Sequence, residues 1–521
     1  VIARVGTSFS QSIQVEQRAA DGTTKAASAG TVVTVSAPAG VLRSNNQSAT
    51  TATATTDANG IATFENLGFE SSVTTAQTLT FTADAFVGTT AQVSPSFIAS
   101  TVNIKSTGTT DGSFIDGVFY SSTSSGANIL NSDLVSAMSQ RSVLVESAGT
   151  ITVEANVVST RADSGLTLKA ISDVTVNSNL TLSTSNGDMV LWARSGSTQN
   201  TTSQSGEGRI SVGNGTSITT NGGDIILAGS SSVDAAGLPN GHAFTNASTG
   251  NRYAISLGTS NSASAASLSS GGGIIRLYGQ TGASATQAYA GVTSTTATTT
   301  VNSGTGRQDW NFISASSGDN AFESWGGLTI QSAATADATT PAINFFVRHN
   351  TSSTTLSPIQ SQGHRPFHRF IASGGGNLNV SISSSADVYA IDNVAGFQFL
   401  ASSGQITVDT GTSGLDLTGP SATDGKQLYF GADGSGSSSS NISIIGGRFN
   451  EVTANNNSGV VVAKTSGTVS IEPSSTAFSS AQTFDPTWAF TGTTGLTFGK
   501  TNNTAGVTVS GANSVAGNLN V

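Results

Sequence analysis

Cysteine is absent from this chain of 521 residues, which excludes a disulfide framework, a thiolate metal site and catalysis by a thiol. Charged residues make up only 10% of the chain and aromatic residues 6%, a composition unlike that of a typical enzyme. The formal net charge of −10 is spread without acidic or basic runs, and no apolar run approaches the roughly 20 residues of a membrane-spanning helix. The sequence therefore predicts neither a nucleic-acid partner nor a membrane span.

The chain instead contains a repeat. Three stretches align without a gap, namely 149–170, 172–193 and 208–229. Each stretch has two apolar residues two positions apart near its start and another such pair near its end. The early pairs are Ile151/Val153, Val174/Val176 and Ile210/Val212, and the late pairs are Leu166/Leu168, Met189/Leu191 and Ile225/Leu227.

A spacing of two places both side chains of a pair on one face of a strand, and a period of about 22 residues is typical of stacked solenoid units. We therefore expect residues 99–521 to form a parallel β-solenoid. Its coils bury their apolar residues only against neighbouring coils, so a long, stiff column is the expected product. Three polar stretches are expected to project from it as loop insertions, at about 230–252, 281–309 and 485–503.

Residues 1–98 differ from the rest of the chain. Alternating apolar runs at 32–37, 60–64 and 78–83 are separated by polar turns, a spacing that predicts a β-sandwich of short antiparallel strands. The segment 56–67 resembles a stretch of the bacterial immunoglobulin-like repeats found in large surface proteins. The fold class expected for the whole chain is all-β, with an immunoglobulin-like β-sandwich followed by the solenoid.

A second resemblance covers residues 128–229. Asn131–Asp133 precede Leu134 and Met138, which lie four apart and predict one short helix with a capping residue ahead of it. This helix, the strand signals at 142–146 and 149–153 and the three aligned repeats resemble repeat tracts of filamentous-haemagglutinin-like bacterial exoproteins. The resemblance implies an elongated, right-handed β-helix that is secreted or attached to the cell surface. The chain begins at Val1 rather than Met, and we expect a processed product or a fragment.

Residue types that carry chemistry are sparse. Asp188 and Asp224 occupy the same repeat position and could share a cation, but both follow Gly at a corner, which favours a turn-forming role. His364 and His368 share one side of an extended strand or of a helical turn, with His349 nearby in sequence, so metal ligation is geometrically possible. Two flanking arginines repel a cation and no carboxylate is near, so the sequence predicts no metal, no cofactor and no catalytic residues.

The segment 310–370 concentrates aromatic and basic residues. Trp and Arg are typical anchors of interfaces, so this segment is a candidate contact for a protein or a glycan. The alternative is a wide coil whose interior holds the aromatic side chains while the basic ones are solvated. The candidate contact residues are Trp310, Trp325, Arg348, Arg365, Arg369 and Phe370.

Function is expected to follow from the shape. The leading hypothesis is a non-enzymatic, exported bacterial structural protein, the subunit of a cell-surface or extracellular fibre. A solenoid ends in unpaired backbone groups, and the run 517–521 shows no capping sequence, so Leu519 and Val521 are expected to meet a neighbouring copy through its N-terminal module, head to tail. Two alternatives stay open: an adhesin stalk that binds another cell surface, and a β-helix protein that binds or cleaves polysaccharides such as surface glycans.

Overall fold

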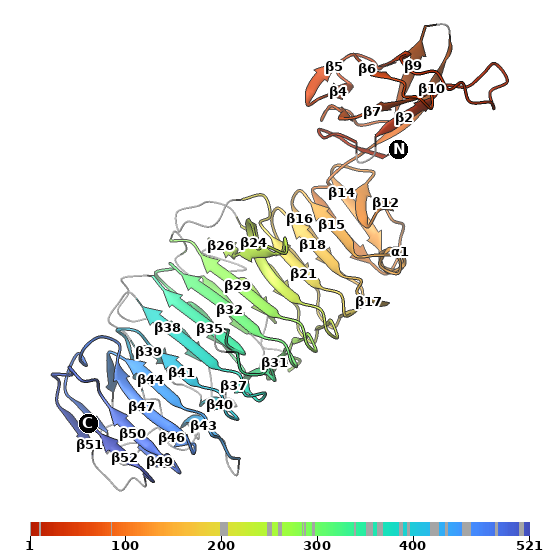
Figure 1. The fold of residues 1–521 in the computed structure, drawn as a ribbon. Helices are drawn as coiled ribbons and strands as arrows, with labels where there is room; N and C mark the ends of the chain where they lie inside the picture. The colour runs from red at the N-terminus through yellow and green to blue at the C-terminus, as the bar shows by residue number, and fades with distance from the viewer. Residues whose placement is uncertain are drawn as a thin grey trace. The chain divides into compact units, whose positions relative to one another are not determined.

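A computed structural model gives the structure of the chain (Figure 1). It describes residues 2–9, 12–84, 86–197, 207–246, 253–258, 263–283, 285, 288–293, 297–337, 340–350, 358–361, 368–384, 389–392, 396–416, 427–432, 436–450, 460–484, 488–509 and 515–521. The fold is all-β, as predicted, and the described residues include one short helix. Two compact units are present, one made of Val1–Val102 with Gly108–Ile129 and the other of Asn103–Thr107 with Leu130–Val521.

The first unit contains a five-stranded sheet in the order β1-β10-β9-β3-β6. A second set of strands, β2-β7 and β5-β4-β8, packs on it around a core that includes the ring pairs Phe64–Phe81 and Phe9–Phe69. The strands are β1 (Ile2–Arg4), β2 (Ile13–Glu16), β3 (Val32–Ser36), β4 (Leu42–Ser44), β5 (Gln47–Ala49), β6 (Thr51–Thr55), β7 (Ile61–Phe64), β8 (Leu67–Phe69), β9 (Gln77–Ala83) and β10 (Phe86–Ser96).

The predicted boundary at 98/99 lies close to the end of the first segment of this unit, Val102, but the unit also takes in 108–129. An antiparallel hairpin explains the addition, because β12 (Gly112–Ile115) pairs with β13 (Val118–Ser121) and the Phe97 amide donates to the Ser121 carbonyl. The linking strands β11 (Thr101–Lys105) and β14 (Gly126–Leu130) each have residues in both units.

The second unit is a parallel solenoid in which most coils contribute one strand to each of three sheets (Figure 1). Within a sheet, these strands pair in parallel with the corresponding strands of the next coil. Sheet 1 holds β15 (Val143–Ser147), β18 (Leu166–Ala170), β21 (Met189–Ala193), β24 (Ile225–Val233), β29 (Ile275–Thr281), β32 (Gln308–Ser314), β35 (Ile343–His349), β38 (Leu378–Ser384), β41 (Ile406–Asp409), β44 (Ile442–Gly446), β47 (Thr468–Pro473), β50 (Gly495–Phe498) and β52 (Asn518–Asn520).

Sheets 2 and 3 form the other two sides of the coils. Sheet 2 holds β16 (Thr150–Val153), β19 (Val174–Val176), β22 (Ile210–Val212), β27 (Tyr253–Leu257), β30 (Tyr289–Thr293), β33 (Phe322–Ser324), β36 (Ile359–Ser361), β39 (Tyr389–Asp392), β42 (Gly414–Asp416) and β45 (Arg448–Asn450). Sheet 3 holds β17 (Val157–Ala162), β20 (Thr181–Ser185), β23 (Ser217–Thr219), β28 (Ser267–Ser269), β31 (Thr299–Asn302), β34 (Leu328–Ser332), β37 (His368–Ala372), β40 (Phe397–Ala401), β43 (Gln427–Gly431), β46 (Val460–Lys464) and β49 (Trp488–Thr491).

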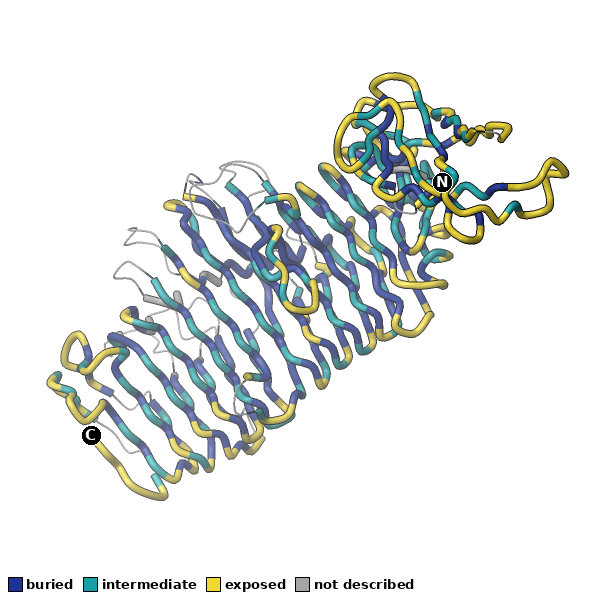
Figure 2. The backbone as a smooth tube through the Cα atoms, turned by 45° about the horizontal axis from the view of Figure 1, so that its top comes forward, coloured by how far each residue is buried: buried dark blue, intermediate teal, exposed yellow. Residues whose placement is uncertain are grey.

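The register confirms the aligned repeats residue by residue. Ile151 pairs with Val174, which pairs with Ile210 in sheet 2, and the late pairs are matched in the same way in sheet 1. These apolar side chains are almost completely buried inside the coils (Figure 2). Helix α1 (Asn131–Met138) is also where it was expected, with Leu134 and Met138 buried. Its predicted side-chain cap is wrong, because the Asn131 amide donates to the Asn156 carbonyl instead.

A recurring turn separates sheet 3 from sheet 1. In several coils a Ser or Thr hydroxyl donates to the carbonyl of a Gly three residues later, as in Thr220–Gly223 and Ser303–Gly306. These glycines form a column: a Cβ on Gly273 would lie 2.1 Å from the Gly223 carbonyl oxygen, and one on Gly306 would lie 1.9 Å from that of Gly273. Successive coils therefore touch backbone to backbone at this corner.

The predicted loop insertions need correction. The stretch 281–309 contains β30 and β31, and 485–503 contains β49 and β50, so both contribute strands to the coils. Their inward positions include small polar residues that hydrogen-bond across coils, as when the Thr281 and Ser314 hydroxyls lie 2.9 Å apart. A polar stretch of sequence can therefore form strands of the solenoid and need not be a loop that projects from it.

The stretch 230–252 is an insertion whose described part folds back. Its strands β25 (Pro239–Gly241) and β26 (Ala243–Thr245) join sheet 1, and Leu238 packs on an apolar cluster of Val190, Trp192 and Ile226. Near the end of the chain, β48 (Gln482–Phe484) and β51 (Val507–Val509) pair with each other in a separate small sheet. Within the residue ranges described above, no helix is long and apolar enough to cross a membrane.

Candidate functional site

The aromatic and basic segment does not form one surface. Trp310 and Phe370 are almost completely buried inside the coils, so neither side chain is available to a partner, which corrects their assignment as contact residues. Three others lie on different sides of the solenoid: Arg348 is exposed on sheet 1, Trp325 is half-buried directly after β33 of sheet 2, and Arg369 is half-buried on sheet 3. Arg365 lies outside the described residues.

The interior of these coils is filled by aromatic rings in contact with one another, the alternative considered for this segment. Trp310 has ring-centroid distances of 6.0 Å to Phe312, 6.5 Å to Phe322 and 5.6 Å to Phe345. Its indole N–H donates to Gln308 over 3.0 Å, and the Gln308 amide donates to two backbone carbonyls of sheet 3. The column continues through Phe370, Phe399 and Phe430.

The histidines are part of the same interior. His349 and His368 are both buried, and burial lowers the pKa of both imidazoles, that of His368 to about 4. His349 Nε2 lies 3.2 Å from the Ser316 carbonyl oxygen, while His364 lies outside the described residues. Among the residues that the structure describes, no group of three or more His, Asp or Glu is arranged to hold a metal.

The two stacked aspartates join coils. One Asp188 carboxylate oxygen accepts the Asp224 backbone N–H over 2.8 Å, and Asp224 in turn accepts the Ile274 N–H of the following coil over 2.7 Å. The expected turn-forming role is therefore corrected to a coil-to-coil bridge. Desolvation by burial, with a smaller contribution from Asp188, raises the pKa of Asp224 above its ordinary value of 3.8.

This raised pKa predicts a pH dependence. Because folding raises the pKa of Asp224, the stability that its protonation contributes is complete below about pH 3.8 and is lost as the pH rises through the folded value. Asp224→Asn keeps the oxygen that accepts the Ile274 N–H and removes the charge, so we expect a higher thermal unfolding temperature than wild type at pH 7 and none of this advantage at pH 3. Asp224→Ala, which removes the acceptor, is expected to unfold at a lower temperature at both pH values. Equal unfolding temperatures of wild type and Asp224→Asn at pH 7 would contradict the assignment.

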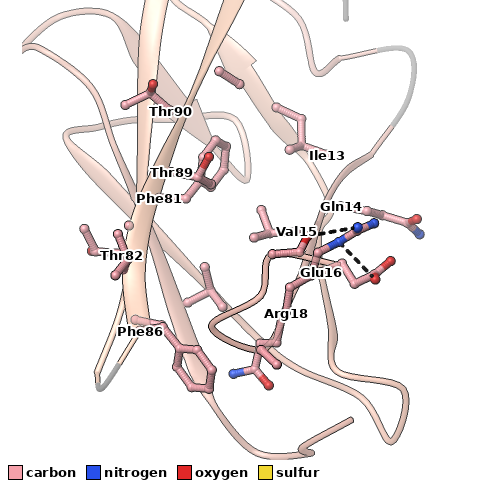
Figure 3. Close-up of a pocket in the computed structure, with 18 of the residues that line it drawn as sticks. Ile13, Gln14, Val15, Glu16, Arg18, Phe81, Thr82, Phe86, Thr89 and Thr90 are labelled. Atoms are coloured by element: carbon pink, nitrogen blue, oxygen red, sulfur yellow. Dashed lines mark hydrogen bonds and ion pairs between the residues drawn. The ribbon is translucent and has the colours of Figure 1, made fainter. Parts of the chain in front are cut away.

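An open groove with a partly apolar lining lies in the first unit. A groove of about 940 Å³ separates β2 from the β9–β10 hairpin, with Ile13 and Val15 on one side and Phe81, Phe86 and Thr89 on the other (Figure 3). Phe81 and Ile13 are buried and belong to the core of the unit, so the floor of the groove is apolar.

Register explains why this groove is open. In an antiparallel pair, residues directly opposite each other point to the same face of the sheet. Phe86, Thr89 and Ala91 are opposite Ala83, Phe81 and Leu79, with a bulge between Phe86 and Thr89. Phe81 and Leu79 are buried, so Thr89 and Ala91 also point toward the interior, yet both are exposed. Among the residues that the structure describes, the inward face of β10 is therefore left open to solvent at Thr89 and Ala91.

Strand edges border the groove on both sides. In the described residues, β10 pairs with β9 at Phe86 and Thr89–Val93 and with β1 only at Ser94–Ser96, and β2 pairs only with β7. The backbone N–H and C=O groups on the outer edge of Phe86–Val93 and on one edge of Ile13–Glu16 thus face the groove or solvent. Such edges are templates for pairing with another strand.

The charges at the rim of the groove are paired with one another. Glu16 lies 3.5 Å from Arg18 and 3.2 Å from Lys25, and these ion pairs are partly exposed. Between these charges the lining is mainly apolar and threonine side chains, with Gln14 and Gln17 on the β2 side. A strand that fits this groove is therefore expected to be uncharged and to carry apolar residues on one face.

Sequence reasoning missed this groove. A signal was present, because Phe86 and Val87 are adjacent large apolar residues in a polar stretch, and they are 39% and 99% exposed. Their exposure depends on which strand covers β10, which the local pattern does not reveal. Comparison with known proteins adds no assignment: no family model, no curated protein and no solved structure matches the chain.

Proposed function

We propose that the chain is a non-enzymatic structural protein exported by a bacterium, the subunit of a cell-surface or extracellular fibre in which copies join head to tail. The observation that carries the proposal is where the exposed large apolar residues lie. In the described chain, Val32, Phe86 and Val87 of the first unit and Leu519 and Val521 of the last coil are exposed, the last two by 54% and 73%. The other exposed large apolar residues lie singly along the solenoid: Val158, Ile171, Val233 and Ile274. A head-to-tail contact joins two different surfaces of the same chain. When such a contact repeats without closing into a ring, the copies form an open filament.

The architecture supports the same proposal. Stacked parallel coils give a stiff column whose length is set by the number of coils, which suits a fibre shaft. The coil register at 149–229 lies in the segment that resembles filamentous-haemagglutinin-like exoproteins, a resemblance that favours an extracellular location. Among the described strands, β52 pairs with β50 alone, and a strand edge without a partner is a template for pairing with another chain.

Electron microscopy of the purified full chain tests the proposal. We expect negative-stain images at increasing protein concentration to show rods joined end to end, and sedimentation to shift from monomer to polymer over the same range. Isolated rods and a monomeric mass at the highest concentration would contradict self-assembly. Isolated rods that bind cells would favour the adhesin stalk instead.

A further inference from the structure

We propose that the groove between β2 and β10 binds the segment 515–521 of a second copy of this chain, which adds to the first unit as an extra β-strand. This inference rests on the proposed head-to-tail assembly and names the site of the joint. Addition of an extended segment to an exposed sheet edge is an established mode of recognition, in which main-chain hydrogen bonds supply affinity and alternate side chains enter pockets.

The groove has the features of a vacant strand position. Its two borders are strand edges, and its lining includes Thr89 and Ala91, which point inward yet are exposed, and the partly exposed Phe86. An added strand would pair with the edge of β10 and place every second side chain against Phe81 and Ile13. Burial of this apolar surface, rather than any charged contact, would stabilise the complex.

The segment 515–521 matches these requirements. It has no charged side chain, and Val515, Leu519 and Val521 fall on one face of an extended chain, with Gly517 between them. The opposite face carries Ala516 and two asparagines. Apolar side chains on one face and polar ones on the other suit a strand with one side in the groove and one side in water.

Release of this segment from its own coil removes little packing. All three residues of β52 are exposed, in contrast to the buried inward residues of the other strands of sheet 1 (Figure 2). Transfer of the segment would break the three pairs of β52 with Gly495–Thr497 of β50 and the hydrogen bond that the Ala516 N–H donates to the Thr493 carbonyl. New main-chain pairs with β10 would replace them, while Leu519 and Val521 would become buried.

Two variants of the full chain test this assignment by complementation. Ala91→Arg places a charged side chain on the groove floor, and Leu519→Asp combined with Val521→Asp makes the donor face acidic. Each variant alone is expected to weaken the joint by about tenfold or more, which corresponds to about 1.4 kcal/mol, and so to lose sedimentable polymer at a concentration where wild type assembles. A mixture of the two is expected to form dimers and no longer species, because the double-aspartate chain keeps an intact groove and the Ala91→Arg chain keeps an intact donor.

Disulfide trapping in the assembled chain provides a test that does not depend on how well Ala91→Arg folds. The protein has no cysteine, so introduced thiols are the only ones present. A mixture of chains carrying Ala91→Cys and Leu519→Cys is expected to give a disulfide-linked dimer under mild oxidation. Thr90→Cys, one residue along β10 and on its opposite face, serves as the matched control and is expected to give at least about tenfold less dimer.

The outcomes separate the two proposals. Polymers that form normally with both the Ala91→Arg and the double-aspartate variants, or equal trapping at positions 90 and 91, would overturn the strand-addition site while leaving head-to-tail assembly in place. Monomers of the wild-type chain under all conditions would instead overturn the proposed function itself.

Discussion

Trp310→Ala is expected to lower the free energy of unfolding of the solenoid by about 3–5 kcal/mol, the range measured for removal of a large buried aromatic side chain. Trp310 is completely buried and contacts rings from three strands, so its removal leaves a cavity that the surrounding sheets cannot close. The Gln308 side chain would also lose the indole N–H that it accepts.

Urea unfolding followed by circular dichroism measures this effect. The matched control is Trp325→Ala, which removes the same side chain from a half-buried position next to β33 and is expected to shift the midpoint much less. Trp310→Phe is expected to fall between the two, since it keeps the ring packing and loses the hydrogen bond. Equal shifts for Trp310→Ala and Trp325→Ala would contradict the interior placement of Trp310.

Gly273→Ala is expected to have a comparably large effect, about 3 kcal/mol of destabilisation, because the coils touch at this corner. An added Cβ would lie 2.1 Å from the Gly223 carbonyl oxygen and 2.3 Å from its carbonyl carbon. Both atoms belong to backbone that is fixed by the ladders on either side, so neither can rotate away. The expected result is local separation of the two coils.

The adjacent glycine offers a control in the same turn. A Cβ on Gly272 would meet its nearest atom, the Thr305 hydroxyl oxygen, at 3.4 Å, which is an ordinary contact distance. Gly272→Ala is therefore expected to change the urea midpoint little. Amide hydrogen exchange should show faster exchange around 223 and 273 in Gly273→Ala alone. Similar exchange in the two variants would argue against backbone contact at this corner.

Much of the solenoid could be predicted because coil stacking has a local signature. Alternating apolar pairs such as Ile151/Val153 point inward whatever the rest of the chain does, and their spacing set the register that the ladders confirm. The same rule failed at 281–309, where inward positions include Thr293, whose hydroxyl lies 2.6 Å from that of Ser324. Hydroxyl pairing across coils satisfies these groups, so a coil can be built without an apolar pattern.

The surfaces could not be predicted in the same way. Trp310 and Arg348 are close in sequence, yet one points into the solenoid and the other out of it, because their positions on adjacent strands of sheet 1 differ in parity. The groove beside β10 depends on which strands pair with β10 and pack over it, and this is decided only when the first unit folds. Sequence periodicity shows which side chains share a face of one strand. It does not show which strand edge lacks a neighbouring strand in the folded unit.

The direction of the ladders has a mechanical consequence. Hydrogen bonds between strands run from one coil to the next, so a pull along the stack loads all three sheets in tension at once. Coils should then separate sequentially, each lengthening the chain by the residues of a single turn, while the remaining turns keep their shape. Under load, each coil that separates would dissipate a small amount of mechanical energy, and the column would extend in small steps.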